Sequence, residues 1–363
     1  MSSPRSVRAR RQFLRTAATA GTGLIAAVSG CSTRNLVSGV DVHFRTLAVE
    51  SPPVGLVKTG VWLVAAGRDG RLVGMDRGDG ERQWEIDTVD ELQTPPAGRD
   101  GRVYVAGKEV VSVDGASERW RTPLPGVASA LAVGGDTVAV GTEDGYVTAV
   151  NGDDSTFVDA DDGQRIWQAR LTRSGAARVD ALASGDGVVY AGSREGVAAA
   201  FDARTGEIRW RTDTAASAIE SAGQRVLLGR RRVHGVRNGE VAWSHDTGNN
   251  WTTEITATTR TAGARWVLAG SRTGENGYVL ALSDDGERLW RRQLTGSATA
   301  LTTVHDGRFA VGVEGDRPAV QQLTTDGDSM WSFETETSVV DAVFGGDWVW
   351  AVTGSGRVVG LSG

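Results

Sequence analysis

The side chains best suited to catalysis or metal binding are few and scattered in this sequence. Its four histidines are His43, His234, His245 and His305, and its single cysteine is Cys31. Metal sites usually take such residues at short, regular spacing, but no histidine here has another four residues away or a cysteine beside it. The nucleophile-elbow pattern Gly-x-Ser-x-Gly does not occur either. The sequence therefore predicts no catalytic residue, no metal ligand and no cofactor-binding residue.

Two groups of acidic residues are the remaining candidates for binding a cation. They are Asp153-Asp154 and the run from Asp159 to Asp162. Neither group has the alternating ligand spacing of a calcium-binding loop. We interpret both as solvated acidic loops.

Charge and composition exclude several classes of protein. The chain has 363 residues, with 39 Lys and Arg against 45 Asp and Glu, a net charge of −6. Five arginines and no acids lie in the first thirty residues, so the remainder carries 34 bases against 45 acids, a net charge of −11. An acidic body of this kind is a poor partner for nucleic acid. Lys58 and Lys108 are the only lysines, and this composition is typical of a salt-adapted, halophilic protein, although a GC-rich genome would account for part of it.

The first forty residues have the pattern of an export and anchoring segment. Arg10-Arg11-Gln12-Phe13-Leu14-Arg15 resembles a twin-arginine signal of haloarchaeal type and precedes a mildly apolar run ending at Gly30. That run is shorter than the roughly 20 apolar residues of a membrane-spanning helix. Val28-Ser29-Gly30-Cys31 resembles a lipobox, whose cysteine thiol is alkylated by lipid. We predict a signal peptide at 1–30 and a lipid-anchored linker at 31–40.

This segment predicts where the folded part resides. A protein exported by the twin-arginine route and lipidated on Cys31 would lie on the outer face of the cytoplasmic membrane, held by its lipid chains. No disulfide could form, because Cys31 is the only cysteine. The alternative is that Cys31 is a free thiol at the end of an uncleaved leader.

A tryptophan recurs along the rest of the chain, each time behind a turn that contains glycine. The mean interval is about 41 residues, and the tryptophans are Trp84, Trp120, Trp167, Trp210, Trp243, Trp290 and Trp331. The clearest unit, Gly185 to Trp210, predicts strands at Val188–Ala191 and Val197–Phe201 and a third strand that carries Trp210. Such a period is typical of β-propeller blades.

The length of the repeat predicts the number of strands and blades. Four strands of about six residues and four short turns occupy roughly 40 residues, which is one antiparallel blade. Residues 41–363 hold eight such units if Phe44 replaces the tryptophan of the first. The last unit, Trp331 to Gly363, lacks an outer strand, which Asp41 to Val49 would supply. We predict an all-β protein, a closed eight-bladed propeller of four-stranded antiparallel blades.

The repeat resembles a known family at the level of individual residues. Ala200-x-Asp202-x-x-Thr205-Gly206-Glu207-x-x-Trp210 matches the tryptophan-docking motif of the pyrroloquinoline-quinone (PQQ)-type propeller repeat. Asp159 to Trp167 and Asp76 to Trp84 keep its spacing, whereas Trp120 and Trp331 keep only the turn and the indole. The resemblance implies that each of these tryptophans lies on the outermost strand of its blade and has a structural role.

The resemblance implies two classes of function. The lipidated plan is similar to that of the bacterial outer-membrane-assembly propeller lipoprotein, which implies a monomeric module that binds or scaffolds envelope or secreted proteins. The alternative is a quinoprotein oxidoreductase acting on alcohols or sugars with PQQ and calcium. Many of those enzymes have a disulfide between adjacent cysteines, which this chain cannot form. We therefore expect a binding protein without a cofactor rather than an enzyme.

The strand order implied by the motif predicts where a partner would bind. The chain would cross from each outermost strand to the next innermost strand on the same rim as the turn between second and third strands, and binding sites gather on such loop faces. We expect that rim to carry Arg68-Asp69, Glu143-Asp144, Arg194-Glu195, Arg230 to Arg232 and Arg272 to Gly277.

One predicted crossing singles out particular partner-binding candidates. We expect the longest crossing at Asp246 to Glu254, and the candidate residues are Asn249, Asn250, Trp251 and Arg231. Asn250-Trp251-Thr252 is also a glycosylation sequon. The alternative is that Trp251 packs against its own blade.

Overall fold

The computed structural model describes residues 39–152, 161–173, 175–222, 225–248, 251–261, 264–271, 276–303 and 307–363. These residues belong to one compact unit, Asn35–Gly363. They form β-strands and turns, and none of them forms a helix with the length and hydropathy needed to cross a bilayer.

The strands form eight antiparallel sheets of four, which we number as blades in chain order. Blades 1 to 4 each use four consecutive strands: β2 (Pro53–Lys58), β3 (Trp62–Gly67), β4 (Arg71–Asp76) and β5 (Arg82–Asp87); β6 (Ala97–Arg99), β7 (Arg102–Ala106), β8 (Glu109–Asp114) and β9 (Ser117–Pro123); β10 (Ala128–Gly134), β11 (Thr137–Thr142), β12 (Tyr146–Asn151) and β13 (Arg165–Arg170); β14 (Ala181–Gly185), β15 (Val188–Ser193), β16 (Val197–Asp202) and β17 (Ile208–Thr212).

Blades 5 to 7 repeat this pattern, and blade 8 completes the set. Their strands are β18 (Ala218–Ala222), β19 (Arg225–Gly229), β20 (Arg232–Arg237) and β21 (Glu240–Asp246); β22 (Trp251–Thr261), β23 (Ala264–Ser271), β24 (Tyr278–Leu282) and β25 (Arg288–Gln293); β26 (Ser297–Thr303), β27 (Phe309–Glu314), β28 (Ala319–Leu323) and β29 (Ser329–Glu334); β30 (Val339–Gly345), β31 (Trp348–Thr353), β32 (Arg357–Ser362) and β1 (Asp41–Leu47).

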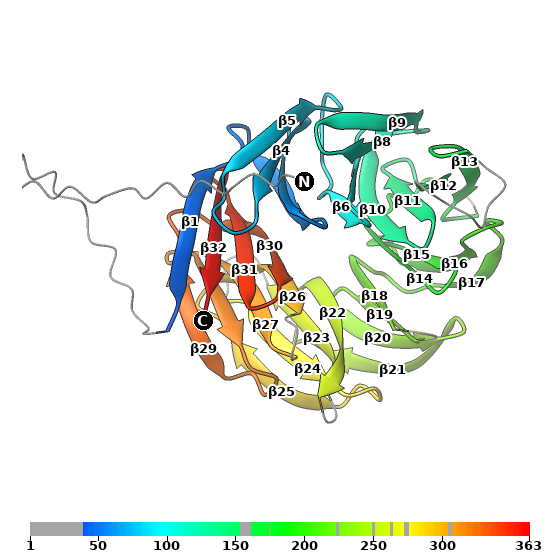
Figure 1. The fold of residues 1–363 in the computed structure, drawn as a ribbon. Helices are drawn as coiled ribbons and strands as arrows, with labels where there is room; N and C mark the ends of the chain where they lie inside the picture. The colour runs from blue at the N-terminus through cyan, green and yellow to red at the C-terminus, as the bar shows by residue number, and fades with distance from the viewer. Residues whose placement is uncertain are drawn as a thin grey trace, which may run out of the picture. The chain divides into compact units, whose positions relative to one another are not determined.

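The two ends of the described chain close the ring. Figure 1 shows the first strand, β1, lying beside the last, β32. The pair is antiparallel, with Phe44 opposite Gly360. This confirms the predicted closed, all-β, eight-bladed propeller and the predicted origin of the missing outer strand. One boundary differs: Trp331 belongs to β29 of blade 7, and blade 8 begins only at Val339.

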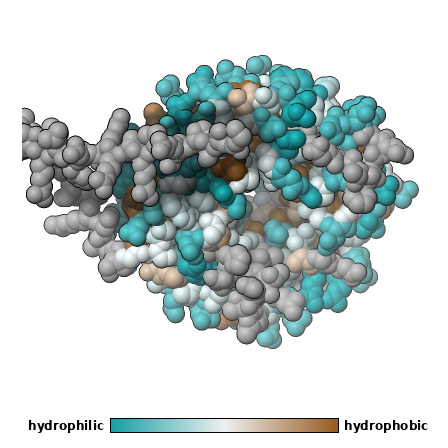
Figure 2. All heavy atoms as spheres, viewed as in Figure 1, coloured by the Kyte–Doolittle hydropathy of each residue, from teal (hydrophilic) through white to brown (hydrophobic). Residues whose placement is uncertain are grey.

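The first strand of every blade lines the inner surface of the ring. Neighbouring first strands contact one another from β2 through to β30, and β30 contacts β2 again. Middle strands such as β11 and β15 are buried along their whole length, because blades cover both of their faces. Outer strands such as β9 alternate exposed and half-buried residues, and hydrophilic side chains cover most of the periphery of the face in Figure 2.

Each docking tryptophan ties its own blade to the next one. All seven lie on the outermost strands, as the resemblance implied. Trp167 of blade 3 packs on Gly206 of blade 4 and donates its indole N–H to Ala203 O at 2.8 Å. A Cβ at Gly206 would lie 2.7 Å from that indole, and its φ of +73° also favours glycine. The recurring glycine therefore leaves room for the neighbouring blade's tryptophan.

Blade 8 makes the same contact with blade 1 by different residues. Phe44 packs on Gly80 but has no N–H to donate. Trp350, on β31 of the same blade, instead donates its indole N–H to Arg77 O at 3.0 Å. Two side chains thus replace one tryptophan where the ring closes.

Candidate partner-binding rim

The crossings between blades and the turns between second and third strands lie on one rim, which we call the crossing rim. In most blades a backbone N–H just after the outermost strand bonds to that blade's turn. Examples are Thr88 N to Gly70 O at 3.0 Å and Leu171 N to Gly145 O at 3.0 Å. These bonds hold crossing and turn together, as the strand order predicted.

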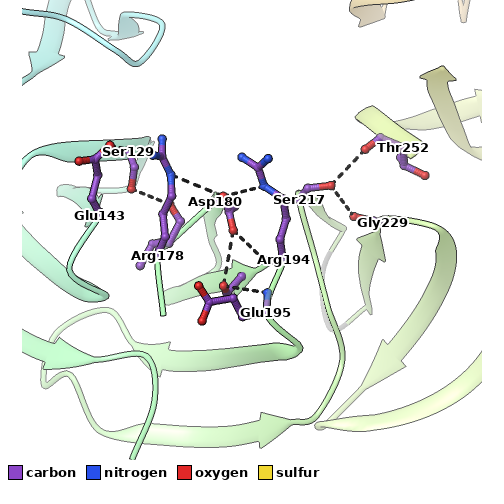
Figure 3. A network of polar contacts seen from close by, with 11 residues as sticks. Ser129, Glu143, Arg178, Asp180, Arg194, Glu195, Ser217, Gly229 and Thr252 are labelled. Carbon is purple, nitrogen blue, oxygen red and sulfur yellow. Dashed lines mark hydrogen bonds and ion pairs between the residues drawn. The ribbon is translucent and has the colours of Figure 1, made fainter. Parts of the chain in front are cut away.

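Blades 3 and 4 carry a polar network on this rim, centred on Asp180 (Figure 3). Asp180 ends the crossing from β13 to β14, and its side chain is only 4% exposed. Its carboxylate accepts from Arg194 N at 2.7 Å and Arg194 Nε at 2.8 Å. Arg178 Nε lies 3.6 Å from the same carboxylate, and Arg178 Nη1 lies 2.7 Å from Glu143 Oε1. One buried carboxylate thus hydrogen-bonds Arg194 and forms a longer ion pair with Arg178, whose Nε has no hydrogen-bond partner in the described structure.

The network joins residues from three separate segments. Glu143 lies in the turn after β11, Arg178 and Asp180 lie on the crossing, and Arg194 lies in the turn after β15. Ser129 Oγ donates to Val179 O at 2.7 Å, and this bond fixes the crossing between Arg178 and Asp180. The side chains of Arg178 and Arg194 stay 39% and 55% exposed, and in Figure 3 their guanidinium groups project the same way. Fixed, solvent-facing donors of this kind suit recognition of another molecule.

The structure describes only some of the predicted partner-binding residues. Arg231 is exposed between β19 and β20, and its carbonyl accepts from Thr247 Oγ1 at 2.7 Å. Asn249, Asn250 and the side chain of Trp251 lie outside the described residues. The predicted long crossing is wrong in its bounds, because β21 ends at Asp246 and Trp251 already opens β22.

Of the other residues singled out in the sequence, some lie outside the described part of the chain and some lie within it. Arg10, Arg11, Cys31, Asp153-Asp154 and His305 lie outside the described residues. His43 stacks on Trp348 with ring centroids 3.7 Å apart, and its Nε2 lies 2.7 Å from Ser362 Oγ. His234 Nδ1 lies 2.7 Å from Ser244 Oγ, and burial, together with the charge of Arg232, lowers the pKa of His234. The two histidine–serine contacts each join neighbouring strands within one blade.

Sequence reasoning missed three acidic residues on the inner surface of the ring. Glu220, Glu254 and Asp341 lie on the innermost strands β18, β22 and β30. Desolvation by the surrounding protein, and then the charges of Asp341 and Glu220, raise the pKa of Glu254 to about 8, although solvent still reaches its side chain. Burial raises the pKa of Glu220 to about 7, and that of Asp341 to about 6 against the opposing hydrogen bonds from Leu56 N and Ala342 N. The available signal was an acid inside an otherwise apolar strand, such as Val339-Val340-Asp341-Ala342-Val343.

Within the described ranges, no three His, Cys, Asp or Glu side chains are arranged to hold a metal ion. The chain also has a single cysteine, Cys31, so it cannot supply the paired cysteines of many quinoprotein oxidoreductases.

We predict that Glu254 makes the protein less stable at alkaline pH. Its pKa is about 8 in the folded state, against about 4.3 in an unfolded chain. Folding therefore favours the protonated acid, and stability falls as pH rises from about 4.3 to about 8. Glu254→Gln should stabilise the protein by about 1–2 kcal/mol at pH 9, a modest gain because solvent reaches this side chain and screens its charge. The gain should be far smaller at pH 5, where the folded protein keeps Glu254 protonated and neutral.

Urea unfolding of both proteins at the two pH values measures this difference. Glu207→Gln, at an exposed acid in the turn before β17, is the control and should change stability equally at both pH values. A gain for Glu254→Gln that does not vary with pH would contradict the prediction.

A family model described as outer membrane protein assembly factor BamB matches residues 68–158, 155–271 and 229–363. A search of curated proteins finds no match.

Solved structures share the fold at low sequence identity. BamB from Moraxella catarrhalis has a TM-score of 0.69 and 17% identity, over 90% of this chain and 98% of its own. The computationally designed Ika8 protein has a TM-score of 0.74 and 16% identity, over 88% and 99%. Quinohemoprotein alcohol dehydrogenase ADHIIG from Pseudomonas putida HK5 has a TM-score of 0.70 and 11% identity, over 89% and 76%. The family match extends over most of the chain, which therefore belongs to the family described as outer membrane protein assembly factor BamB.

Proposed function

We propose that this protein is a membrane-anchored scaffold that binds envelope or secreted proteins through its crossing rim. The observation that carries the proposal is the Asp180 network, which fixes the exposed guanidinium groups of Arg178 and Arg194 side by side. A rigid ring that presents fixed charges on one loop face loses little conformational entropy on binding. The family's description as an assembly factor supports a role in protein interaction.

The anchoring part of the proposal rests on the sequence. The twin-arginine pattern at Arg10-Arg11 and the lipobox at Cys31 would place the mature ring on the outer face of the cytoplasmic membrane. There the crossing rim would meet other envelope proteins.

Neutralising the Asp180 network tests the rim as the partner face. Asp180→Asn, Arg178→Gln and Arg194→Gln, made together, remove the exposed charges without leaving a buried carboxylate unpaired. We expect proteins that co-purify with the detergent-extracted wild type to fall on the order of 10-fold, while the melting temperature changes little. Quantitative mass spectrometry of the co-purified proteins gives the measurement.

An ion pair at the other end of blade 4 supplies the matched control. Arg209 Nη2 lies 2.7 Å from Asp202 Oδ2, at the ends of β17 and β16 that point away from the crossing rim. Asp202→Asn with Arg209→Gln should leave the co-purified proteins unchanged. Equal losses in the two sets of variants would contradict the proposal.

The alternative function is a PQQ-dependent oxidoreductase, which the fold of the quinohemoprotein alcohol dehydrogenase favours. Calorimetry with PQQ and calcium, followed by dye-linked oxidation of alcohols and sugars, separates the two functions. Micromolar or tighter PQQ binding with turnover would favour the enzyme.

A further inference from the structure

A cavity of about 200 Å³ lies between blades 5 and 6, beside the docking tryptophan Trp243. Leu227 of β19 and Trp266 of β23 line it together with that indole. Leu227 and Trp266 belong to one buried cluster on which Trp243 packs, and Trp243 Nε1 donates to Asp284 O at 2.6 Å. Packing and a hydrogen bond between the blades therefore fix the apolar walls. A cavity of about 150 Å³ with such walls can hold benzene, so this one has room for a substituted benzene ring.

In blades 2 and 4, a tyrosine on the second strand lies beside the docking tryptophan. Tyr104 lies 5.9 Å from Trp120 in blade 2, measured between ring centroids. Tyr190 lies 6.0 Å from Trp210 in blade 4. Leu227 has the equivalent place in blade 5, because in all three blades this residue lies opposite the third-strand residue that pairs with the docking tryptophan. Leucine is smaller than tyrosine, so blade 5 leaves space where blades 2 and 4 have a ring.

Four charged residues line the end of the cavity that points away from the crossing rim. Arg225 begins β19 and Arg237 ends β20, and they are opposite each other in the strand register. Asp284 and Asp285 lie in the turn between β24 and β25. Arg225 and Asp284 form an ion pair that joins the two blades, and the Asp284 side chain is only 19% exposed. The formal charges of these four residues cancel, and their polar atoms stand next to the apolar walls.

This lining favours a neutral ligand with one apolar end and one hydrogen-bonding end. Arg225 and Arg237 would repel a cation, and Asp284 and Asp285 would repel an anion. A phenolic hydroxyl is both a donor and an acceptor, so it can donate to a carboxylate and accept from a guanidinium. We propose that the cavity binds a small neutral phenol, with its ring against the two indoles and its hydroxyl at the charged end. Such a ligand takes the place of the tyrosine side chain that blades 2 and 4 carry.

Fluorine NMR of 4-fluorophenol tests the site on the detergent-extracted full chain. The probe has a single fluorine, and its signal broadens when the protein binds it. At about pH 7 the probe is neutral, like a tyrosine side chain, whose pKa is about 10. Fluorobenzene has the same ring without the hydroxyl and is the comparison ligand. Detergent micelles take up each compound equally in every variant, so a difference between variants reports the cavity.

The wild type should bind 4-fluorophenol saturably, with a dissociation constant on the order of 1 mM, as expected for a ligand of this size. Fluorobenzene should bind on the order of 10-fold more weakly, because it forms no hydrogen bond at the charged end of the cavity. Added salt should change the affinity for 4-fluorophenol little, since this ligand carries no charge.

Three variants locate the site. Leu227→Tyr places in the cavity the ring that blades 2 and 4 have, and it should weaken binding by a factor on the order of 10 or more while near-ultraviolet circular dichroism stays native. Ile208→Tyr adds the same ring at an exposed position on β17 and should leave binding unchanged. Ala242→Phe enlarges an exposed lining residue on β21 and should obstruct the cavity, so it tests the site even if Leu227→Tyr does not fold.

Three results would overturn the inference. These are no saturable binding of 4-fluorophenol by the wild type, equal binding by the wild type and both cavity variants, and binding of fluorobenzene as tight as that of 4-fluorophenol. The phenol site goes beyond the scaffold function and is tested separately, because the Asp180 network variants leave every residue of the cavity unchanged. Loss of co-purified proteins in those variants would stand even if no phenol bound.

Discussion

Replacing Trp350 with alanine is expected to destabilise the folded ring by about 3–5 kcal/mol. The indole is 3% exposed and packs in one cluster with Phe44, Leu56 and Leu63, so the change removes contacts on both sides of the closure. It also removes the hydrogen bond to Arg77 O, which joins blade 8 to blade 1. Equilibrium unfolding in urea measures the loss, and the slope of the transition checks that folding stays cooperative.

Two further variants show how much of the lost stability comes from the apolar contacts of Trp350 and how much from its place at the closure of the ring. Trp350→Phe keeps most of the apolar contact and should cost about 1–2 kcal/mol through the carbonyl left without its donor. Trp84→Ala is the matched tryptophan control, because that indole is only half-buried and its N–H has no partner in the described structure. If Trp350→Ala costs no more than Trp84→Ala, Trp350 does not fasten the ring.

Cys31→Ser is expected to move the protein from the membrane fraction into the medium, or to leave it unprocessed with its leader attached. Paired lipid chains give stable anchoring, and no other part of the proposed anchor would replace them. Arg10→Lys with Arg11→Lys should instead retain the protein in the cytoplasm, since the export pathway would no longer recognise the signal. Cell fractionation and immunoblotting distinguish the three locations.

The two variants also control for each other. Cys31→Ser keeps the twin-arginine pair and should still be exported, whereas the Arg-to-Lys variant keeps Cys31 and should not be lipidated outside. Unchanged fractionation in both variants would contradict the predicted export and anchoring.

The blades could be predicted because the repeat encodes local geometry. In the unit ending at Trp210, Asp202 Oδ1 accepts from Arg204 N at 3.0 Å and Thr205 N at 3.1 Å, and Gly206 completes the turn with positive φ. These bonds involve residues within a few positions of one another, so the pattern is visible in the sequence. The structure has strands at Val188–Ser193 and Val197–Asp202, close to the predicted bounds.

The residues that close the ring and build the rim could not be predicted in the same way. Trp350 takes over the hydrogen bond of a docking tryptophan from β31, two strands away from Phe44, and only the register of Phe44, Gly360 and Trp350 reveals it. The Asp180 network joins Glu143 to Arg194 across two blades. Contacts of that kind depend on how far each blade rotates from the last, which no local pattern records. The rim itself was predictable, because strand order alone determines which loops share a face.

Site-specific photo-crosslinking in intact cells tests the central claim most directly. One photoreactive residue replaces Glu195, exposed on the crossing rim of blade 4, and another replaces Arg204, exposed at the opposite end of the same blade. The scaffold account predicts crosslinks to a small, reproducible set of envelope proteins from position 195 and none of these from position 204. The same set captured from position 204, with nothing captured from position 195, would contradict it.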